Sequence, residues 1–174
     1  MTVLVLPAAL RARIADEARA ALPGECCGLI EGRRDGVGRV VAAAVHPARN
    51  IGGGDDRFEI DPADHIRILR AARARGMEIV GCYHSHPNGR AEPSSRDLVG
   101  AVEVGFVWLI AALERPRNRG DANGSDRIAG NAMGDGAAAG EAVTLAAFAF
   151  VGGGFVPVLL AETAALDPAR GLWV

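Results

Sequence analysis

The sequence predicts an α/β fold in which helices flank a mixed central β-sheet. Strand-like and helix-like segments alternate along the chain, and two pairs of apolar runs are separated by glycine-containing turns. Residues 106–113 form a continuous apolar run, which fits a strand buried on both faces at the centre of a sheet. At 174 residues the chain has the size of a single domain, residues 1–174, that can bury a core without disulfides or structural metals.

Apolar runs, several of them rich in β-branched residues, predict the strands of this sheet. The expected strands are residues 2–6, 26–31, 38–45, 78–83 running on into 84–86, 106–113, 142–150 and 155–160. The turns at residues 32–36 and 152–154 are expected to join their neighbouring strands as hairpins. Residues 58–60 are expected to add a short edge strand.

Three helices are expected between the strands. Pro7 suits a first helical turn and opens an alanine-rich segment that ends near Gly24. Asp61, directly before a proline, is a helix-start signal for a segment with helical apolar spacing that ends at Gly76. Ser94 is a third start signal, for a short helix that follows the strand at residues 78–83.

Two segments are predicted to lack regular structure. Residues 46–56 contain three consecutive glycines and two aspartates, which is typical of a surface loop. Residues 115–140 are rich in Gly, Ala, Asn and Asp, so they cannot bury enough apolar surface to offset the entropy lost on ordering. We therefore expect a flexible insertion at residues 115–140.

The composition argues against two classes of partner. The formal net charge is −2 and the basic residues are scattered, so no continuous positive surface is expected for nucleic acid or an anionic membrane. The N-terminal apolar run has no basic leader, and Pro7 breaks it far short of a membrane span. Cys26 and Cys27 are adjacent within an odd total of three cysteines, which favours reduced thiols. These observations predict a cytoplasmic protein.

The residue pattern around His84 predicts a metal site. His84 and His86 lie two residues apart on a predicted strand, so both point to one face with Cα atoms roughly 7 Å apart. Pro87 ends that strand, and the chain returns to a helix whose first turn can direct Asp97 toward both imidazoles. Two neutral imidazoles and a carboxylate are ligands that zinc accepts.

A site with three protein ligands leaves one position open for water, which distinguishes catalytic from structural zinc. A closed site would need Cys82, which faces the same side of the strand. Its Cα is expected roughly 13 Å from that of His86, too far for a thiolate and an imidazole to share one ion. The sequence therefore predicts one catalytic Zn²⁺ per chain, held by His84, His86 and Asp97.

The same residues also have a purely structural interpretation. Single histidines usually pack in a core or lie in solvent, and Ser94-x-x-Asp97 has the pattern of a helix capping box. Taken alone, capping is the better interpretation of Ser94 and Asp97. The histidine pair beside them favours the metal site.

The stretch from His84 to Asp97 closely resembles the signature of the JAMM/MPN+ metalloproteases. That signature is His-x-His-Pro, six variable residues and then Ser-x-x-Asp, and every fixed position is present here at unbroken spacing. Members of the family also carry a catalytic glutamate upstream, commonly within Glu-x-Cys-Gly-Leu, and Glu25-Cys-Cys-Gly-Leu29 matches that pattern. The resemblance covers roughly residues 3–158.

This resemblance implies a cytidine-deaminase-like MPN fold and a zinc peptidase. It implies that Glu25 is the general base, that Ser94 stabilises the oxyanion, and that the zinc activates a water. It further implies that the substrate is an amide or isopeptide bond after the C-terminal Gly-Gly of a ubiquitin-like protein. A small domain of prokaryotic type favours a sulfur-carrier protein over polyubiquitin as that partner.

Three other hypotheses fit parts of the pattern. A nucleoside deaminase needs His-x-Glu and Pro-Cys-x-x-Cys, and neither motif is present. The DNA-repair relatives known as RadC share His-x-His-Pro, but the block that begins at Glu25 and the lack of a helical DNA-binding extension argue against them. A non-catalytic MPN-type scaffold that only binds partner proteins is the main alternative, although such scaffolds typically lose the metal ligands that this sequence retains.

Overall fold

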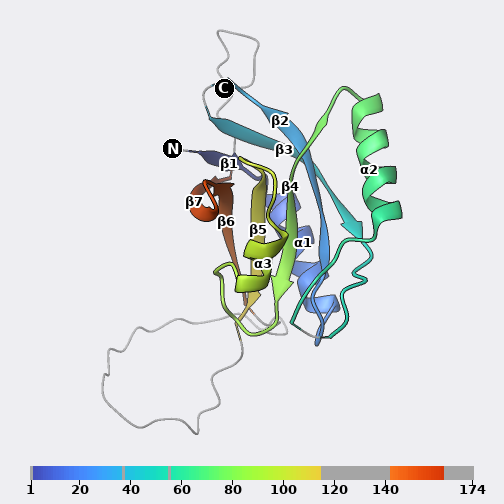
Figure 1. Cartoon of the computed structure of the whole chain (residues 1–174), viewed down its shortest axis with the longest axis vertical. Coiled ribbons are helices and arrows are strands. Elements are labelled where there is room, and N and C mark those ends of the chain that lie inside the picture. The colour runs from blue at the N-terminus through green and yellow to red at the C-terminus, as the bar shows by residue number, and fades with distance from the viewer. Residues whose placement is uncertain (1, 37, 55, 115–141, 163–174) are drawn as a thin grey trace, which may run out of the picture.

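A curved β-sheet with helices packed against it forms the body of the protein (Figure 1). The computed structural model describes residues 2–36, 38–54, 56–114 and 142–162, and the predicted insertion at residues 115–140 lies outside these ranges. The elements in chain order are β1 (Val3–Val5), α1 (Ala8–Ala20), β2 (Cys27–Arg34), β3 (Arg39–Ala48), α2 (Pro62–Ala74), β4 (Glu78–His86), α3 (Ser95–Gly100), β5 (Val107–Leu113), β6 (Val143–Val151) and β7 (Gly154–Ala161).

The sheet is mixed, as predicted, but it closes on itself. Its strands are ordered β1-β3-β2-β4-β5-β6-β7, and β1 pairs in parallel with both β3 and β7 to complete a barrel. β4 and β5 are also parallel, and the remaining pairs are antiparallel. The prediction of a mixed sheet flanked by helices is therefore confirmed in its coarse form, and the closure by β1 was not predicted.

The three predicted helix starts are confirmed, and two of them have side-chain caps. The Asp61 carboxylate accepts hydrogen bonds from the backbone N–H groups of Ala63 and Asp64 at 2.8 and 3.1 Å, with Pro62 in the first turn. Such a cap satisfies N–H groups that have no partner within the helix. Pro7 immediately precedes α1, and Ser94 caps α3.

Three predicted boundaries are wrong. The β2–β3 hairpin turns after Arg34, because Gly32 continues the strand through a register shift and does not begin the turn. β3 extends to Ala48, so the loop predicted at residues 46–56 begins only at residue 49. Residues 58–60 form no edge strand, since only Ile60 pairs, in an isolated bridge with Asn50.

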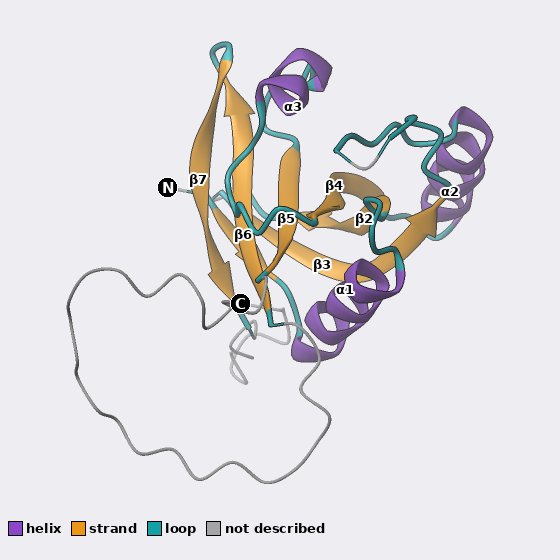
Figure 2. Ribbon diagram, turned by 90° about the horizontal axis from the view of Figure 1, so that it is seen from below, coloured by secondary structure: helices purple, strands orange, loops and turns teal. Residues whose placement is uncertain are grey.

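The two faces of the sheet bury separate apolar clusters. On one face α1 contributes Ile14 and Ala18 to the larger cluster, and on the other Ile68 of α2 packs with Cys82 and Trp108 in the smaller one. Figure 2 shows the end of β3 passing between α1 and α2. All seven residues of β5 are buried, which confirms the prediction of a fully buried strand. The described part of the chain contains no helix with the length and apolar character needed to cross a lipid bilayer.

Gly28, within the Glu-x-Cys-Gly-Leu pattern, allows the backbone of β2 to approach Tyr83. A Cβ atom at this position would lie 2.4 Å from the Tyr83 ring and 2.4 Å from the His46 carbonyl oxygen, so a side chain cannot be accommodated. The Tyr83 hydroxyl donates to the Glu17 carboxylate of α1, and burial raises the pKa of Tyr83. This contact ties α1 to the strand that carries the histidine pair.

A buried carboxylate holds the C-terminal end of α2 on the sheet. Glu31 of β2 accepts hydrogen bonds from Arg75 at 3.2 Å (Nε) and 2.5 Å (Nη2), and His46 Nε2 lies 2.7 Å from the same carboxylate. The hydrogen bonds from Arg75 hold the pKa of Glu31 below its usual value, against the effect of burial. This cluster of Glu31, Arg75 and His46 fixes the distance between α2 and β2.

We predict that Glu31→Gln lowers the free energy of unfolding by about 2 kcal/mol at neutral pH, since it removes charge-assisted hydrogen bonds. The lowered pKa of Glu31 means that this stability is present above the ordinary carboxyl pKa and is lost as the pH falls through the lowered value. Denaturant unfolding should therefore show the difference from wild type shrinking as the pH falls below the ordinary carboxyl range. Glu92→Gln, at an exposed position, is the control, and an equal effect of both variants would contradict the prediction.

Candidate active site

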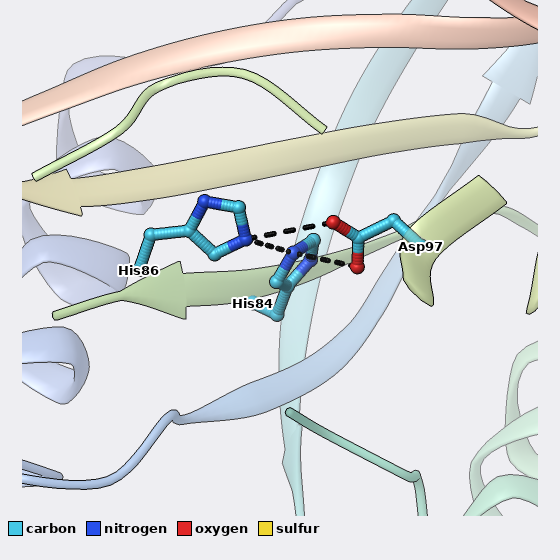
Figure 3. Close-up of side chains that lie close together, drawn as sticks. All are labelled: His84, His86 and Asp97. Atoms are coloured by element: carbon cyan, nitrogen blue, oxygen red, sulfur yellow. Dashed lines mark hydrogen bonds and ion pairs between the residues drawn. The ribbon is translucent and has the colours of Figure 1, made fainter. Parts of the chain in front are cut away.

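β4 carries two histidines to one face of the sheet, where α3 meets it. His84 is fully buried and His86 is 4% exposed, and their Nε2 atoms lie 3.0 Å apart. The Asp97 carboxylate on the first turn of α3 lies 3.3 Å from His84 Nε2 and 3.6 Å from His86 Nε2. Figure 3 shows the three side chains pointing toward one another. The predicted return of α3 to the histidine pair is confirmed.

The spacing of these atoms fits a tetrahedral metal ion. Ligands about 2.0–2.1 Å from zinc in a tetrahedron lie about 3.3–3.4 Å from each other, close to the separations observed here. Among the described residues, His84, His86 and Asp97 form a group that can hold a metal ion, and Cys82 is not part of it. Cys82 is instead buried in the apolar cluster around Trp108, as its position on an extended strand predicts.

A backbone carbonyl orients His86. Its Nδ1 lies 2.7 Å from the Arg90 carbonyl oxygen, which can only accept, so Nδ1 carries the proton and the Nε2 lone pair faces His84 and Asp97. The Arg90 carbonyl is presented by a turn in which Asn88 Oδ1 accepts from Arg90 N–H at 2.9 Å and Gly89 has φ +78°. An outer hydrogen bond of this kind fixes a ligand's tautomer and ring orientation.

Aromatic rings orient His84. The Phe58 ring is stacked on the imidazole, with centroids 4.2 Å apart and an interplanar angle of 22°, and Trp108 approaches edge-on at 6.1 Å. His84 Nδ1 is buried with no hydrogen-bond partner among the described residues. The orientation of the His84 ring is therefore set by its packing against Phe58 and Trp108 and by the contacts of its Nε2 atom with His86 and Asp97. The two aromatic rings exclude water from the Nδ1 side of the imidazole.

The charge states of Asp97 and His84 suit ligation of a cation. Burial raises the pKa of Asp97, but its contacts with His84 and His86 outweigh this effect and hold the pKa well below the ordinary carboxyl range. Burial lowers the pKa of His84 and favours its neutral form. Burial also opposes charge on His86, but the Asp97 carboxylate outweighs it and raises the pKa of His86. The carboxylate is thus ionised and one imidazole is held neutral.

Ser94 and Asp97 form the predicted helix capping box, and this role is compatible with the position of Asp97 in the group that can hold a metal ion. Ser94 N–H donates to Asp97 Oδ2 at 2.6 Å, and Asp97 N–H donates to Ser94 Oγ at 3.2 Å. This reciprocal capping box fixes the carboxylate that faces the histidines. Because Oγ acts as an acceptor in the cap, the hydroxyl hydrogen of Ser94 is available to a further acceptor.

Glu25 lies beside the histidine pair, two residues before the start of β2. Cys27 is paired with His84 across β2 and β4, and Ser85 N–H donates to the Cys26 carbonyl at 3.1 Å, so continuation of this register places Glu25 level with His86. Glu25 is 8% exposed. Burial raises the pKa of Glu25 to about 7, and the nearby His86 partly opposes the shift. A carboxyl with this pKa exchanges its proton near neutral pH, as a general base must.

A cavity of about 650 Å³ opens onto the site, a size typical of ligand pockets. Its lining comes from the site, the loop before α2, α2 itself and the segment from α3 to β5. It includes Glu25, His86, Ser94, Asp97, Asp56, Phe58, Ile60, Leu69, Arg73, Arg96, Val102, Phe106 and Trp108. The Arg96 guanidinium of α3 pairs with the Asp56 carboxylate of the loop at 2.5 Å, so an ion pair joins two walls of the cavity.

Several contributors to the site were not predicted from the sequence. Phe58 gave no signal beyond its apolar character, because its stacking depends on how the loop before α2 folds. Arg90 acts through its backbone carbonyl, which no residue type reveals. The Asn88-Gly89 pair, a turn signal directly after His-x-His-Pro, is the feature that points to the turn behind His86.

Comparison with known proteins identifies the family. A family model described as prokaryotic homologs of the JAB domain matches residues 7–123, a range that contains Glu25, His84, His86, Ser94 and Asp97. The chain belongs to this family. The resemblance to the JAMM/MPN proteins is therefore confirmed, with this JAB-domain protein a member of prokaryotic type.

Curated relatives and a solved structure agree with this assignment. The JAB-domain chain is 39% identical over 92 residues to "Desampylase" of Haloferax volcanii, covering 52% of this chain and 63% of the relative. It is 38% identical over 77 residues to "Probable TtuB-protein conjugate cleaving protease" of Thermus thermophilus, covering 44% and 48%. These alignments span less than two thirds of either relative. The solution structure of protein DSY2949 from Desulfitobacterium hafniense matches with a TM-score of 0.70 at 25% identity, over 91% of this chain and 92% of that chain.

We predict that Gly89→Ala weakens zinc binding by about 10–100-fold, because it displaces the Arg90 carbonyl from His86. Gly89 has φ +78°, and an added Cβ would lie 3.1 Å from the Leu113 carbonyl oxygen. Gly105→Ala is a matched control, since Gly105 has φ +79° with nothing within 4 Å of an added Cβ. Affinity measured by competition with a zinc-binding dye should fall only for Gly89→Ala, and equal affinities would contradict the role of the turn.

Proposed function

We propose that this JAB-domain protein is a zinc-dependent peptidase or isopeptidase that cleaves the amide bond after the C-terminal Gly-Gly of a ubiquitin-like or sulfur-carrier protein. The observation that carries the proposal is the convergence of His84, His86 and Asp97 beside a cavity that is lined by His86, Asp97 and Glu25. The names of the two curated relatives support conjugate cleavage as the reaction class.

His84, His86 and Asp97 are the residues that would hold one zinc ion per chain. A zinc ion held by these three side chains would lower the pKa of a bound water to about 7 and so would supply the nucleophile. Asp97 provides negative charge and a fixed oxygen, and the Arg90 carbonyl keeps His86 in the tautomer that ligation requires.

Glu25 is the general base in this proposal. Its carboxylate accepts the proton of the attacking water and later delivers it to the leaving amine, so water and amide become a carboxylate and a free amine. Burial supports this role because it raises the pKa of Glu25 to about 7, at which both protonation states are populated at neutral pH. The register of β2 with β4 holds Glu25 beside His86.

Ser94 is the group proposed to stabilise the oxyanion. As the amide carbonyl is attacked, charge develops on its oxygen, and a fixed hydroxyl donor at that place lowers the barrier. The capping box supports this role because it fixes Ser94 relative to Asp97 while leaving the hydroxyl hydrogen free to donate.

The cavity favours a substrate tail without side chains. Glycine has no Cβ, so two glycines pass between close walls where other residues would clash. Phe58, packed on His84, and the Arg96–Asp56 ion pair line the cavity along which such a tail would pass. Free thiols at Cys26, Cys27 and Cys82 support a reducing, cytoplasmic setting for the reaction.

We expect purified protein reconstituted with zinc to contain about one zinc per chain and to cleave a carrier fusion after Gly-Gly. His84→Ala should lose both the metal and the activity, because it removes a ligand. Glu25→Gln should keep the metal and lose cleavage, since it removes only the base. Elemental analysis and a gel-based cleavage assay measure these outcomes.

His65→Ala is the control for metal content, because His65 is an exposed histidine on α2. If wild-type protein bound no zinc after reconstitution, the peptidase hypothesis would fail and a protein-binding scaffold would replace it. If wild type bound zinc but left every Gly-Gly fusion intact, the substrate class would be wrong.

We also predict that Ser94→Gly lowers kcat on the order of 10²–10³-fold, because the oxyanion loses a fixed donor. Glycine is a tolerable N-cap, so the free energy of unfolding should change by only a few tenths of a kcal/mol. Steady-state kinetics and thermal unfolding of the same sample check the two parts. Unchanged kcat with zinc retained would assign Ser94 to capping alone.

A further inference from the structure

We propose that Asn50 is a positioning residue for the general base Glu25, which it ties to the loop that carries Phe58. The inference rests on the proposed function, because it concerns how that function's base is held. Asn50 opens the loop of residues 49–60, between β3 and α2, and its side chain is half-buried.

The Asn50 side chain makes four hydrogen bonds, all to the backbone. Its Nδ2 donates to the Glu25 carbonyl at 2.9 Å and to the Arg57 carbonyl at 3.2 Å. Its Oδ1 accepts from the N–H groups of Gly52 at 2.9 Å and Glu59 at 3.0 Å. A carboxamide offers two donors and two acceptor lone pairs, so the group is fully used.

Three of these bonds determine the path of the loop. The acceptor bonds from Gly52 and Glu59 close the loop around the carboxamide, and the donor bond to Arg57 fixes the residue before Phe58. The loop packs so closely there that a Cβ on Gly52 would lie 3.0 Å from Asn50 Oδ1 and 2.9 Å from the Glu59 backbone nitrogen. Phe58 is thereby directed onto the His84 ring.

The fourth bond connects this loop to the base. Glu25 precedes β2, so the ladder of backbone hydrogen bonds between strands does not hold its own carbonyl. The next residue is fixed to β4, since Cys26 N–H donates to Ser85 Oγ at 2.8 Å and the Cys26 carbonyl accepts from Ser85 N–H at 3.1 Å. The Glu25 carbonyl and the Cys26 N–H belong to one peptide unit, so Asn50 and Ser85 hold the two edges of the peptide that follows Glu25.

Asparagine is the side chain that this arrangement requires. An aspartate would keep the two acceptor bonds but present oxygen to the Glu25 and Arg57 carbonyls, where a donor is needed. An alanine would leave all four backbone groups without their hydrogen bond to the side chain of residue 50. Loss of the donor bonds shifts the Glu25 backbone, and a displacement near 1 Å in a reacting group costs on the order of 10²-fold in rate.

Arg49, the neighbouring residue, provides a matched control. It anchors the same loop to α2 through contacts with Asp61 and Asp64 at 3.1 Å each, and its side chain is 68% exposed. Its removal loosens the loop at the adjacent position without touching a bond to Glu25. A general effect of loop mobility should therefore appear in Arg49→Ala as well as in Asn50→Ala.

The experiment compares zinc-loaded wild type, Asn50→Ala, Asn50→Asp and Arg49→Ala on a carrier fusion cleaved after Gly-Gly. Both Asn50 variants are expected to lose about 10²-fold in kcat with KM within about threefold of wild type and zinc content unchanged. Arg49→Ala should keep kcat. Thermal unfolding of each variant checks that it is folded at the assay temperature.

A second comparison separates the base from the cavity wall. In the Glu25→Gln background, which leaves the fusion uncleaved, adding Asn50→Ala should change the Kd for the fusion by no more than about twofold. A tenfold weaker Kd would overturn the inference, as would equal kcat losses in the Asn50 and Arg49 variants. Inactive zinc-loaded wild type would instead overturn the proposed function itself.

Discussion

The antiparallel pairing of β2 with β4 sets the positions of the groups on which the proposed chemistry depends. It places Cys27 opposite His84 and thereby brings Glu25, which would otherwise be an ordinary loop carboxylate, beside His86. Parallel pairing of β4 with β5 requires a crossover, and that crossover contains α3 and Asp97. Because β4 is bonded on both sides, its histidines need little reorganisation to bind an ion.

Much of the fold could be predicted because its signals are local. Helix caps such as Asp61, and the apolar run of β5, specify their elements through nearest neighbours. Barrel closure was missed because the three residues of β1 carry no information about which distant strands they join. The β2–β3 turn was misplaced because Gly32 serves a register shift, and glycine gives the same signal in a strand irregularity as in a turn.

The candidate site likewise contains residues whose positions could be predicted from local signals and residues whose positions could not. His84, His86 and Asp97 are close in sequence at spacings that match strand and helix geometry, so their convergence could be predicted. Phe58 and Asn50 contribute through a loop whose conformation depends on hydrogen bonds to remote backbone groups. A polar loop residue such as Asn50 has no distinctive pattern, and its four bonds become apparent only when β2 and the loop are placed side by side.

The Asp97 carboxylate belongs both to the cap of α3 and to the group that can hold a metal ion, and this has a thermodynamic consequence. α3 has only six residues, too few to be stable on their own, so its order depends on the capping box and on packing. Any cation bound by Asp97 fixes the same carboxylate that accepts from Ser94 N–H. Ion binding and helix order would therefore be reciprocally linked: a bound ion would stabilise α3, and fraying of α3 would weaken ion binding by the same free energy.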